Sequence, residues 1–271
     1  MRASCSKTPD WGTSFVLMGA EFTEDAVLGG KLLLKQPRRG HRFGHDALLL
    51  AAACPARARE RVVDLGAGVG AAGLALALRV DGAEVTLVEV DPDLAALAAE
   101  NARVNGLAAR VRSVVLDVAA PAPAFAAAGL APESVARVLM NPPFNDPVRQ
   151  RGSPDPQRRL AHEGPAGTLA AWVRTGARLL RPGGTLTLIW RADGLADVVH
   201  ALEAAFGAVT VLPVHSKAGE PAIRILVRAT KASRAPLALL PGLVLNDDTG
   251  VPTAEAETVL RGGALLPLGE T

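Results

Sequence analysis

The chain has 271 residues, a formal net charge of +2 and 49% hydrophobic residues. This length and composition suit one large domain or two small ones, with a hydrophobic core large enough to be stable without disulfides or metal ions. No apolar run reaches the roughly 18 residues of a membrane-spanning helix, and the N-terminus matches a signal peptide poorly. The two cysteines, Cys5 and Cys54, lie far apart and are too few for a zinc site. We therefore expect no metal, no membrane partner and a cytoplasmic location.

The organisation along the chain is predicted as one main domain with a segment at each end. Residues 1–22 are expected to be a disordered tail, and translation could start at Met1 or at Met18. Residues 23–235 are assigned to a single domain with a basic lead-in, because no repeat or low-complexity linker divides them. Residues 236–271 are predicted to form a C-terminal extension.

From Arg61 onward, short β-rich runs alternate with helical runs. Strands are predicted at 61–65, 83–90, 109–118, 136–140 and 185–190, and helices at 70–80, 91–106, 167–184 and 195–207, with a short one near 253–261. Apolar strands that alternate with helices predict a parallel sheet covered on both faces. The runs AVTVLPVHS and AIRILVRAT are separated only by KAGEP, which is too short for a parallel crossover. The predicted fold is α/β: a doubly wound, mostly parallel sheet with an antiparallel terminal hairpin, which resembles the Rossmann-like class I methyltransferase architecture.

A glycine-rich turn joins the first of these strands to its helix, in VVDLGAGVGAAG at 62–73. Gly66, Gly68 and Gly70 would let the backbone approach a ligand, and the following helix would present free N–H groups to it. The spacing also fits a dinucleotide fingerprint, so an NAD-binding oxidoreductase remains an alternative. Asp64 favours S-adenosylmethionine, because a carboxylate there could bind the amino group of a methionine moiety but would repel a pyrophosphate.

Four polar residues stand at the ends of four consecutive predicted parallel strands, namely Asp64, Glu89, Asp117 and Asn141. In open α/β sheets, ligands bind beyond the carboxyl ends of the strands. Glu89 is predicted to accept hydrogen bonds from ribose hydroxyls, and Asp117 to meet the adenine amino group. Taken singly, either acid could also be a helix cap or a solvated strand end. Together they predict a site for S-adenosylmethionine, with S-adenosylhomocysteine as the product and no metal.

The last of these strand ends runs into Asn141-Pro142-Pro143-Phe144. Each proline has a fixed φ and lacks an N–H, and each restricts the residue before it, so the segment is stiff and offers only acceptors. The side-chain oxygen of Asn141 and the carbonyl of Pro142 could hold both hydrogens of an amino group, so that its nitrogen can attack a methyl group. Phe144 would offer a flat face to a base removed from its stack.

This motif resembles the Asn-Pro-Pro-aromatic signature of amino-methyltransferases, which act on adenine, guanine or protein glutamine. Together with GHDALLLAAA and VVDLGAGVG, the run VLMNPPF also resembles the bacterial tRNA adenine-N6 methyltransferase family, over most of the chain from Phe22 onward. That family belongs to the class I small-domain methyltransferases and modifies the adenine beside the anticodon of a valine tRNA. The resemblance implies an N-methyltransferase for adenine N6 in tRNA, with RNA as its partner and no obligatory protein partner.

Two basic stretches flank the glycine turn and the Asn-Pro-Pro motif. The predicted RNA contacts are Lys35, Arg38, Arg39 and Arg42 before the turn, and Arg149, Arg151, Arg158 and Arg159 after the motif. Contacts to phosphates would make binding dependent on salt, although the second stretch could also be a solvated loop. Between them, GHDALLLAAA is predicted to begin a helix capped by His45 or Asp46.

Other methyl acceptors and other classes of protein remain open as alternatives. Guanine N2 of ribosomal RNA and protein glutamine would use the same chemistry. Glutamine enzymes resemble this chain in core and motif but carry a helical N-terminal domain, whereas the residues before Arg61 do not read as a helical bundle. An oxidoreductase would leave the Asn-Pro-Pro motif unexplained, and a non-catalytic RNA-binding module would not need both motifs.

Overall fold

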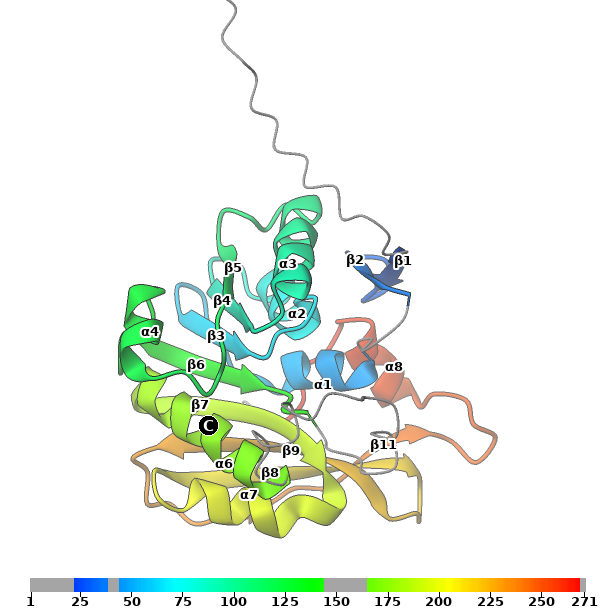
Figure 1. The fold of residues 1–271 in the computed structure, drawn as a ribbon. Helices are drawn as coiled ribbons and strands as arrows, with labels where there is room; N and C mark the ends of the chain where they lie inside the picture. Colours follow the sequence, from blue (N-terminus) through cyan, green and yellow to red (C-terminus); the bar gives the residue numbers. More distant parts are fainter. Residues whose placement is uncertain (1–21, 39–43, 144–164, 269–271) are drawn as a thin grey trace, which may run out of the picture.

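The structure is a computed structural model that describes residues 22–38, 44–143 and 165–268 (Figure 1). The tail predicted at 1–22 lies outside these residues except for Phe22, which begins the first strand.

A central sheet of nine strands organises the fold (Figure 1). Its strands are β3 (Arg61–Leu65), β4 (Glu84–Glu89), β5 (Val111–Val115), β6 (Val135–Met140), β7 (Leu180–Arg191), β8 (Phe206–Lys217), β9 (Ala222–Lys231), β10 (Ala238–Leu239) and β11 (Leu243–Asn246). They lie in the order β10-β8-β9-β7-β6-β3-β4-β5, with β11 also paired to β8. Only β9 is antiparallel to its neighbours β7 and β8. The predicted fold class, a mostly parallel sheet with an antiparallel terminal hairpin, is therefore confirmed.

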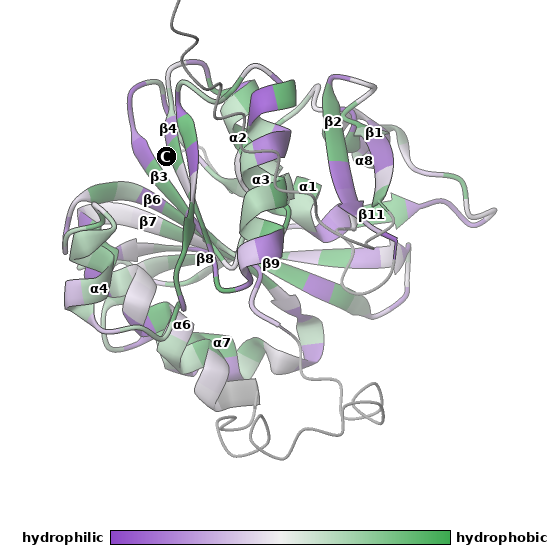
Figure 2. Ribbon diagram, turned by 45° about the horizontal axis from the view of Figure 1, so that its top comes forward, coloured by the Kyte–Doolittle hydropathy of each residue, from purple (hydrophilic) through white to green (hydrophobic). Residues whose placement is uncertain are grey.

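Helices cover both faces of this sheet, as Figures 1 and 2 show. One face carries α1 (His45–Ala53), α2 (Ala71–Arg79) and α3 (Pro92–Val104), and the other carries α4 (Ala122–Ala127), α6 (Pro165–Leu179) and α7 (Leu195–Leu202), which follows the 3-10 helix η1 (Ala192–Gly194). Two apolar clusters fill the spaces between the layers, because the buried strands are apolar on both sides. Within the described part of the chain, no helix is both long enough and apolar enough to cross a membrane.

The lead-in forms an antiparallel hairpin that the sequence reading did not assign, β1 (Phe22–Val27) with β2 (Leu32–Pro37). Leu32 and Leu34 of β2 are buried in the core. The other edge of β2 is satisfied by two asparagine side chains, Asn101 of α3 and Asn105 directly after it. The amide of Asn105 bonds the N–H and the carbonyl of Leu33 at 2.9 and 2.7 Å, so a side chain replaces a neighbouring strand.

One expectation changes at the start of a helix. The helix α1 begins at His45 after Gly44, without a side-chain cap, so the predicted cap by His45 or Asp46 is wrong. The Asp46 carboxylate instead forms an ion pair with Nε of Arg224 at 2.9 Å, which anchors α1 to β9. Asp46 stays in the first turn of α1, but its carboxylate pairs with Arg224 and caps no backbone N–H.

The predicted C-terminal extension packs into the main core. Beyond β10 and β11 it forms α8 (Ala254–Leu260), close to the predicted short helix. Leu243, Val259 and Leu266 are each buried to within 2% exposure. The extension therefore shares the hydrophobic cluster that lies beneath α1 and α2.

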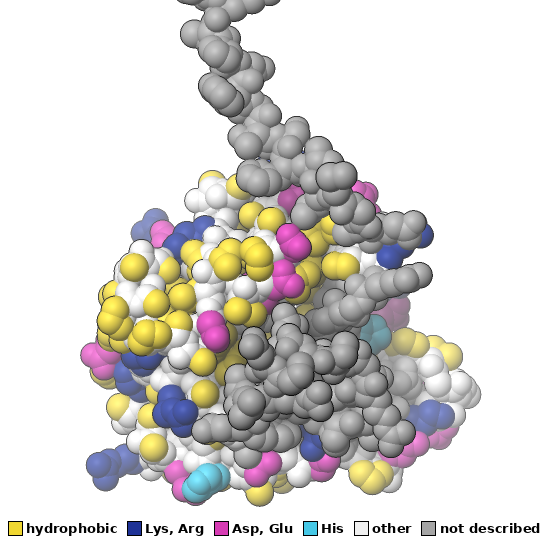
Figure 3. Space-filling model, in the orientation of Figure 1, with side chains coloured by type: hydrophobic (Ala, Val, Ile, Leu, Met, Phe, Trp, Pro, Cys, Tyr) yellow, Lys and Arg dark blue, Asp and Glu magenta, His cyan; other side chains and the backbone are white. Residues whose placement is uncertain are grey.

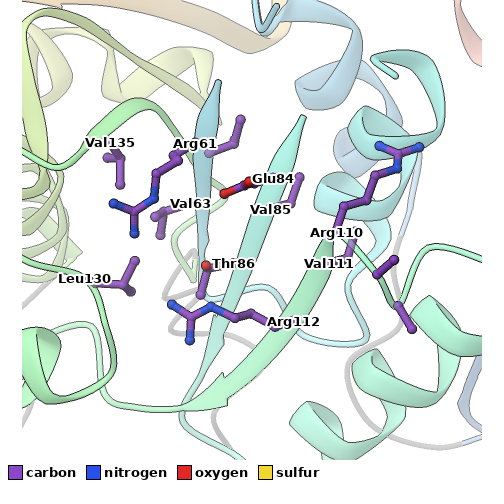
Figure 4. A pocket seen from close by; sticks show the side chains of 13 residues that line it. Arg61, Val63, Glu84, Val85, Thr86, Arg110, Val111, Arg112, Leu130 and Val135 are labelled. Atoms are coloured by element: carbon purple, nitrogen blue, oxygen red, sulfur yellow. The ribbon is translucent and has the colours of Figure 1, made fainter. Parts of the chain in front are cut away.

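A cleft of about 400 Å³ lies at the amino ends of β3, β4 and β5, on the edge of the sheet opposite the glycine turn (Figure 4). Arg61 and Arg112 reach over the strands from this edge, and Figure 4 shows Glu84 and Thr86 between them. Nη2 of Arg61 donates to the carbonyl of Gly129 and Nη2 of Arg112 to that of Ala128, both at 2.9 Å. These arginines fasten the turn after α4 to the sheet, so this cleft is not the candidate active site.

Candidate active site

The strand order brings the four predicted strand-end residues to one edge of the sheet. The neighbours β6, β3, β4 and β5 end, in that order, near Asn141, Asp64, Glu89 and Asp117. Leu65 of β3 pairs with Met140 of β6, and on its other side with Val88 of β4. The turn that follows Leu65 therefore lies between the ends of β6 and β4.

The glycine turn is tied to β4 through its own backbone. The N–H groups of Gly66 and Ala67 both donate to the carbonyl of Val88, at 2.8 and 2.9 Å. Gly66, Gly68 and Gly70 have φ values of +69°, +55° and +87°, in the left-handed region that side chains rarely adopt. The sequence places glycine at these positions because the turn needs this conformation to enter α2.

Glu89 orders the same turn from the end of β4. It is 7% exposed, and one carboxylate oxygen accepts the N–H of Gly68 at 2.8 Å. The other oxygen accepts the N–H groups of Val90 and Asp91 at 2.9 and 3.0 Å. A carboxylate offers about four acceptor sites, so Glu89 keeps capacity for a further donor. Its predicted role toward ribose hydroxyls remains a prediction.

Glu89→Ala is expected to lower the free energy of unfolding by about 3 kcal/mol, because three backbone donors lose a charged acceptor. Chemical denaturation with urea measures this change. Glu89→Gln is the matched control: it keeps one acceptor oxygen and should lose about half as much. Equal stability of wild type and Glu89→Ala would contradict the anchoring role of this carboxylate.

Asp64 is the next-to-last residue of β3 and is 2% exposed. Its Oδ2 accepts the N–H of Gly73 at 2.8 Å, within the first turn of α2. Burial raises the pKa of Asp64 to about 7; the Gly73 hydrogen bond works against this shift and nearby Glu89 adds to it. Asp64 therefore joins β3 to α2, and its predicted contact with a methionine amino group remains a prediction.

The Asn-Pro-Pro corner leaves β6 beside the glycine turn. Asn141 is half-buried, Pro142 is buried and Pro143 is exposed. The buried ring of Pro142 holds the corner in place, and the prolines restrict the backbone. Phe144, the fourth residue of the motif, lies outside the described residues. Asn141 thus stands at a fixed point next to Gly66, since Met140 and Leu65 are paired.

Asp117 lies two residues beyond β5 and is exposed. Its Oδ1 accepts the N–H of Ala119 at 2.8 Å and so closes a local turn. The side chain keeps its second oxygen for other donors, and the predicted contact with an adenine amino group remains a prediction.

Among the eight predicted RNA contacts, only Lys35 and Arg38 lie within the described residues. Nζ of Lys35 lies 3.7 Å from the carboxylate of Glu24 and 3.4 Å from that of Glu100. Arg38 is exposed after the end of β2. Arg39, Arg42, Arg149, Arg151, Arg158 and Arg159 lie outside the described residues. On the face in Figure 3, Lys and Arg side chains gather at the left margin near α4, whereas acidic side chains lie over α3.

Sequence reasoning missed two residues that contact the glycine turn. Asn101 of α3 is fully buried; its amide bonds the N–H and the carbonyl of Lys35, at 2.8 and 3.0 Å, and donates to the carbonyl of Val69 at 3.0 Å. Asn101 thereby joins the N-terminal hairpin to the turn. The signal was available, because Asn101 sits on the apolar face of a helix, four residues before Asn105. The second residue is Trp172 of α6, whose ring fills the space where Gly66 lacks a side chain.

At Gly68 an added Cβ would meet nothing within 4 Å, so the turn is open to a ligand there, whereas Gly66 faces Trp172 and Gly70 faces Leu87. Acidic side chains stand on either side of the turn. Within the described ranges, no three His, Cys, Asp or Glu side chains converge as metal ligands.

Comparison with known proteins gives the family. Residues 42–218 match the model of the methyltransferase small domain. Over 162 residues the chain is 32% identical to a release factor glutamine methyltransferase of Chlorobaculum tepidum, a match that covers 58% of this chain and 54% of that protein. It is 29% identical over 158 residues to a tRNA1(Val) (adenine(37)-N6)-methyltransferase of Tolumonas auensis, covering 58% and 62%. These matches span less than two thirds of the length of either relative.

Other relatives match over more of their length. A tRNA1(Val) (adenine(37)-N6)-methyltransferase of Dickeya chrysanthemi is 28% identical over 213 residues, which cover 76% of this chain and 81% of that protein. A crystal structure from Agrobacterium tumefaciens, described as a predicted O-methyltransferase, has a TM-score of 0.70 and 32% identity, and covers 82% of this chain and 98% of that one. The family model matches more than half of the chain and contains the glycine turn and the Asn-Pro-Pro corner. The chain therefore belongs to the methyltransferase small-domain family.

Proposed function

We propose that this protein is an S-adenosylmethionine-dependent N-methyltransferase that modifies the exocyclic amino group of a nucleobase, namely adenine N6 in tRNA. One observation carries the proposal: pairing of Leu65 with Met140 sets the Asn141-Pro142 corner next to the glycine turn. The turn supports the choice of methyl donor, and the corner supports an amino group as acceptor.

The proposed cofactor residues are Asp64, Gly66, Gly68, Gly70, Glu89 and Asp117. When bound, S-adenosylmethionine supplies an electrophilic methyl group on a positively charged sulfur. Asn141 and the carbonyl of Pro142 hold the two hydrogens of the acceptor amine, which orients its nitrogen and increases its reactivity. Phe144 offers a surface for the base. These groups position the acceptor, and no general base is required before the new nitrogen–carbon bond forms; the methylated nitrogen then releases its extra proton to solvent.

The relatives of this chain and the basic residues of its sequence support tRNA as the substrate. Several relatives are named tRNA1(Val) (adenine(37)-N6)-methyltransferase, and such a substrate is consistent with a cytoplasmic enzyme. Lys35, Arg38, Arg39, Arg42, Arg149, Arg151, Arg158 and Arg159 are the proposed phosphate contacts. Lys35 already lies near two carboxylates, so RNA would have to compete for it.

The test is transfer of tritiated methyl groups from S-adenosylmethionine to RNA and to protein, both prepared from cells that lack this enzyme. We expect label in the tRNA fraction and N6-methyladenosine after nuclease digestion and mass analysis. Label in N2-methylguanosine would replace the adenine acceptor by guanine. Label that resists ribonuclease and is recovered in a release factor would favour protein glutamine, the activity named for the Chlorobaculum relative, and would refute the RNA proposal.

A further inference from the structure

The helix α6 is fixed firmly against the sheet. Gly176 faces β6 and β7 so closely that a Cβ there would come within 2.9 Å of Leu186 and 3.2 Å of Met140. Oγ1 of Thr175, which is buried, donates to the carbonyl of Val118 at 2.8 Å. Nη2 of Arg178 donates to the carbonyl of Ala120 at 3.1 Å. The sheet contacts α6 at Gly176, and the segment after β5 contacts it at Thr175 and Arg178. These contacts fix the position of α6.

Trp172 lies one helical turn before Gly176 on the same face of α6. The outer edge of its indole, atoms Cζ2, Cη2 and Cζ3, rests on Gly66, and a Cβ on Gly66 would overlap Cη2. Trp172 is only half-buried. Since Leu65 pairs with Met140, Gly66 lies beside Asn141, so this ring stands near the seam between the proposed cofactor turn and the acceptor corner.

The chain's other described tryptophan shows a different environment. Trp190 is 3% exposed and lies within the apolar cluster beneath α6 and α7. Its indole packs against Gly194, in the 3-10 helix after β7, and not against the glycine turn. Core packing thus accounts for Trp190, whereas Trp172 packs against the same apolar cluster from its margin and stays half-buried.

We propose that Trp172 recognises the positive charge of the methyl donor through the electron-rich face of its indole. This inference rests on the proposed function. A cation over a tryptophan face is attracted by the ring quadrupole, and the attraction grows when water is excluded. S-adenosylmethionine carries a positive sulfur, whereas the sulfur of S-adenosylhomocysteine is neutral. Trp172 therefore favours the donor over the product, which would assist exchange after each transfer.

The test compares dissociation constants, measured by calorimetry, for ligands that differ in charge. Trp172→Leu is expected to weaken binding of S-adenosylmethionine by about tenfold. Binding of sinefungin, whose ammonium group replaces the sulfonium, should weaken by a similar factor. Binding of S-adenosylhomocysteine should weaken by less than about threefold. Trp172→Phe should recover much of the difference. Trp190→Leu is the matched control: it removes an indole from the core and should leave the ratio of the donor and product affinities unchanged.

A second measurement covers the case in which Trp172→Leu fails to fold. Fluorinated tryptophan is incorporated into a protein that carries Trp11→Phe and Trp190→Phe, so that only Trp172 is labelled. Fluorination lowers the negative potential of the ring face while nearly keeping its shape. The fluorinated protein should bind S-adenosylmethionine more weakly, and its affinity for S-adenosylhomocysteine should stay unchanged. Equal losses for both ligands, or no loss, would overturn the charge-recognition role. If the wild-type protein binds neither ligand, the proposed function fails instead.

Discussion

Replacing Asn141 by alanine is expected to lower the rate of methyl transfer about a thousandfold, because the acceptor amine loses a fixed partner in the transition state. Affinity for S-adenosylhomocysteine should stay within about twofold of wild type, since the proposed cofactor contacts lie on β3, on β4, in the turn after β3 and after β5. Single-turnover transfer to tRNA and calorimetry measure the two quantities. The side chain is half-buried at the end of β6, so we expect the fold to persist.

Two further variants make this result specific. Asn141→Asp keeps an acceptor oxygen and should retain more activity than the alanine variant, in spite of its added charge. Asn246 is the control, because it also stands at a strand end, on β11, and its Nδ2 donates to the carbonyl of Ser216 at 3.2 Å. Asn246→Ala should keep full transfer activity. Undiminished transfer by Asn141→Ala, or its failure to fold, would mean that the corner is structural.

The second large effect is a dependence of stability on pH that originates at Asp64. Burial raises the pKa of this carboxyl group from 3.8 to about 7 in the folded state. Between these values the folded protein holds a proton that the unfolded chain releases, so stability is greatest at low pH and falls as pH rises toward 7. From pH 5 to pH 8 this one group should remove about 3 kcal/mol from the free energy of unfolding.

Asp64→Asn separates this contribution from those of other groups. Asparagine has nearly the same shape, stays neutral and can still accept the N–H of Gly73. The stability of the variant relative to wild type should therefore rise by about 3 kcal/mol between pH 5 and pH 8, measured by urea denaturation at several pH values. Asp117→Asn, at an exposed position, should follow the wild-type curve. A constant difference between wild type and Asp64→Asn would exclude a buried proton at this site.

The same proton offers a test of the cofactor assignment. A positively charged methionine amino group near Asp64 would favour the ionised carboxylate. Cofactor binding near pH 6 should then release a proton, which calorimetry in buffers of different ionisation enthalpy detects. Proton release that persists in Asp64→Asn would assign it to another group.

The fold class, much of the element order after Arg61 and the sheet edge at which the four strand-end residues gather were predictable, because they follow from local pattern. Apolar runs bounded by glycine gave the strands, and their alternation with helices gave the parallel sheet. The short KAGEP link excluded a parallel crossover, and β8 and β9 are indeed antiparallel. Since parallel strands end at one edge, polar residues at four strand ends had to converge there.

The contacts between distant elements were decided only by the tertiary structure. The sequence cannot show that Trp172 rests on Gly66, because packing of α6 through Gly176 determines that approach. The amides of Asn101 and Asn105 occupy the edge of β2, a partnership over 66 to 72 residues that no periodicity encodes. The protonation of Asp64 likewise depends on burial. Periodicity and motif spacing are local properties of the sequence. Burial, strand register and side-chain contacts depend on how distant segments pack together in the folded chain.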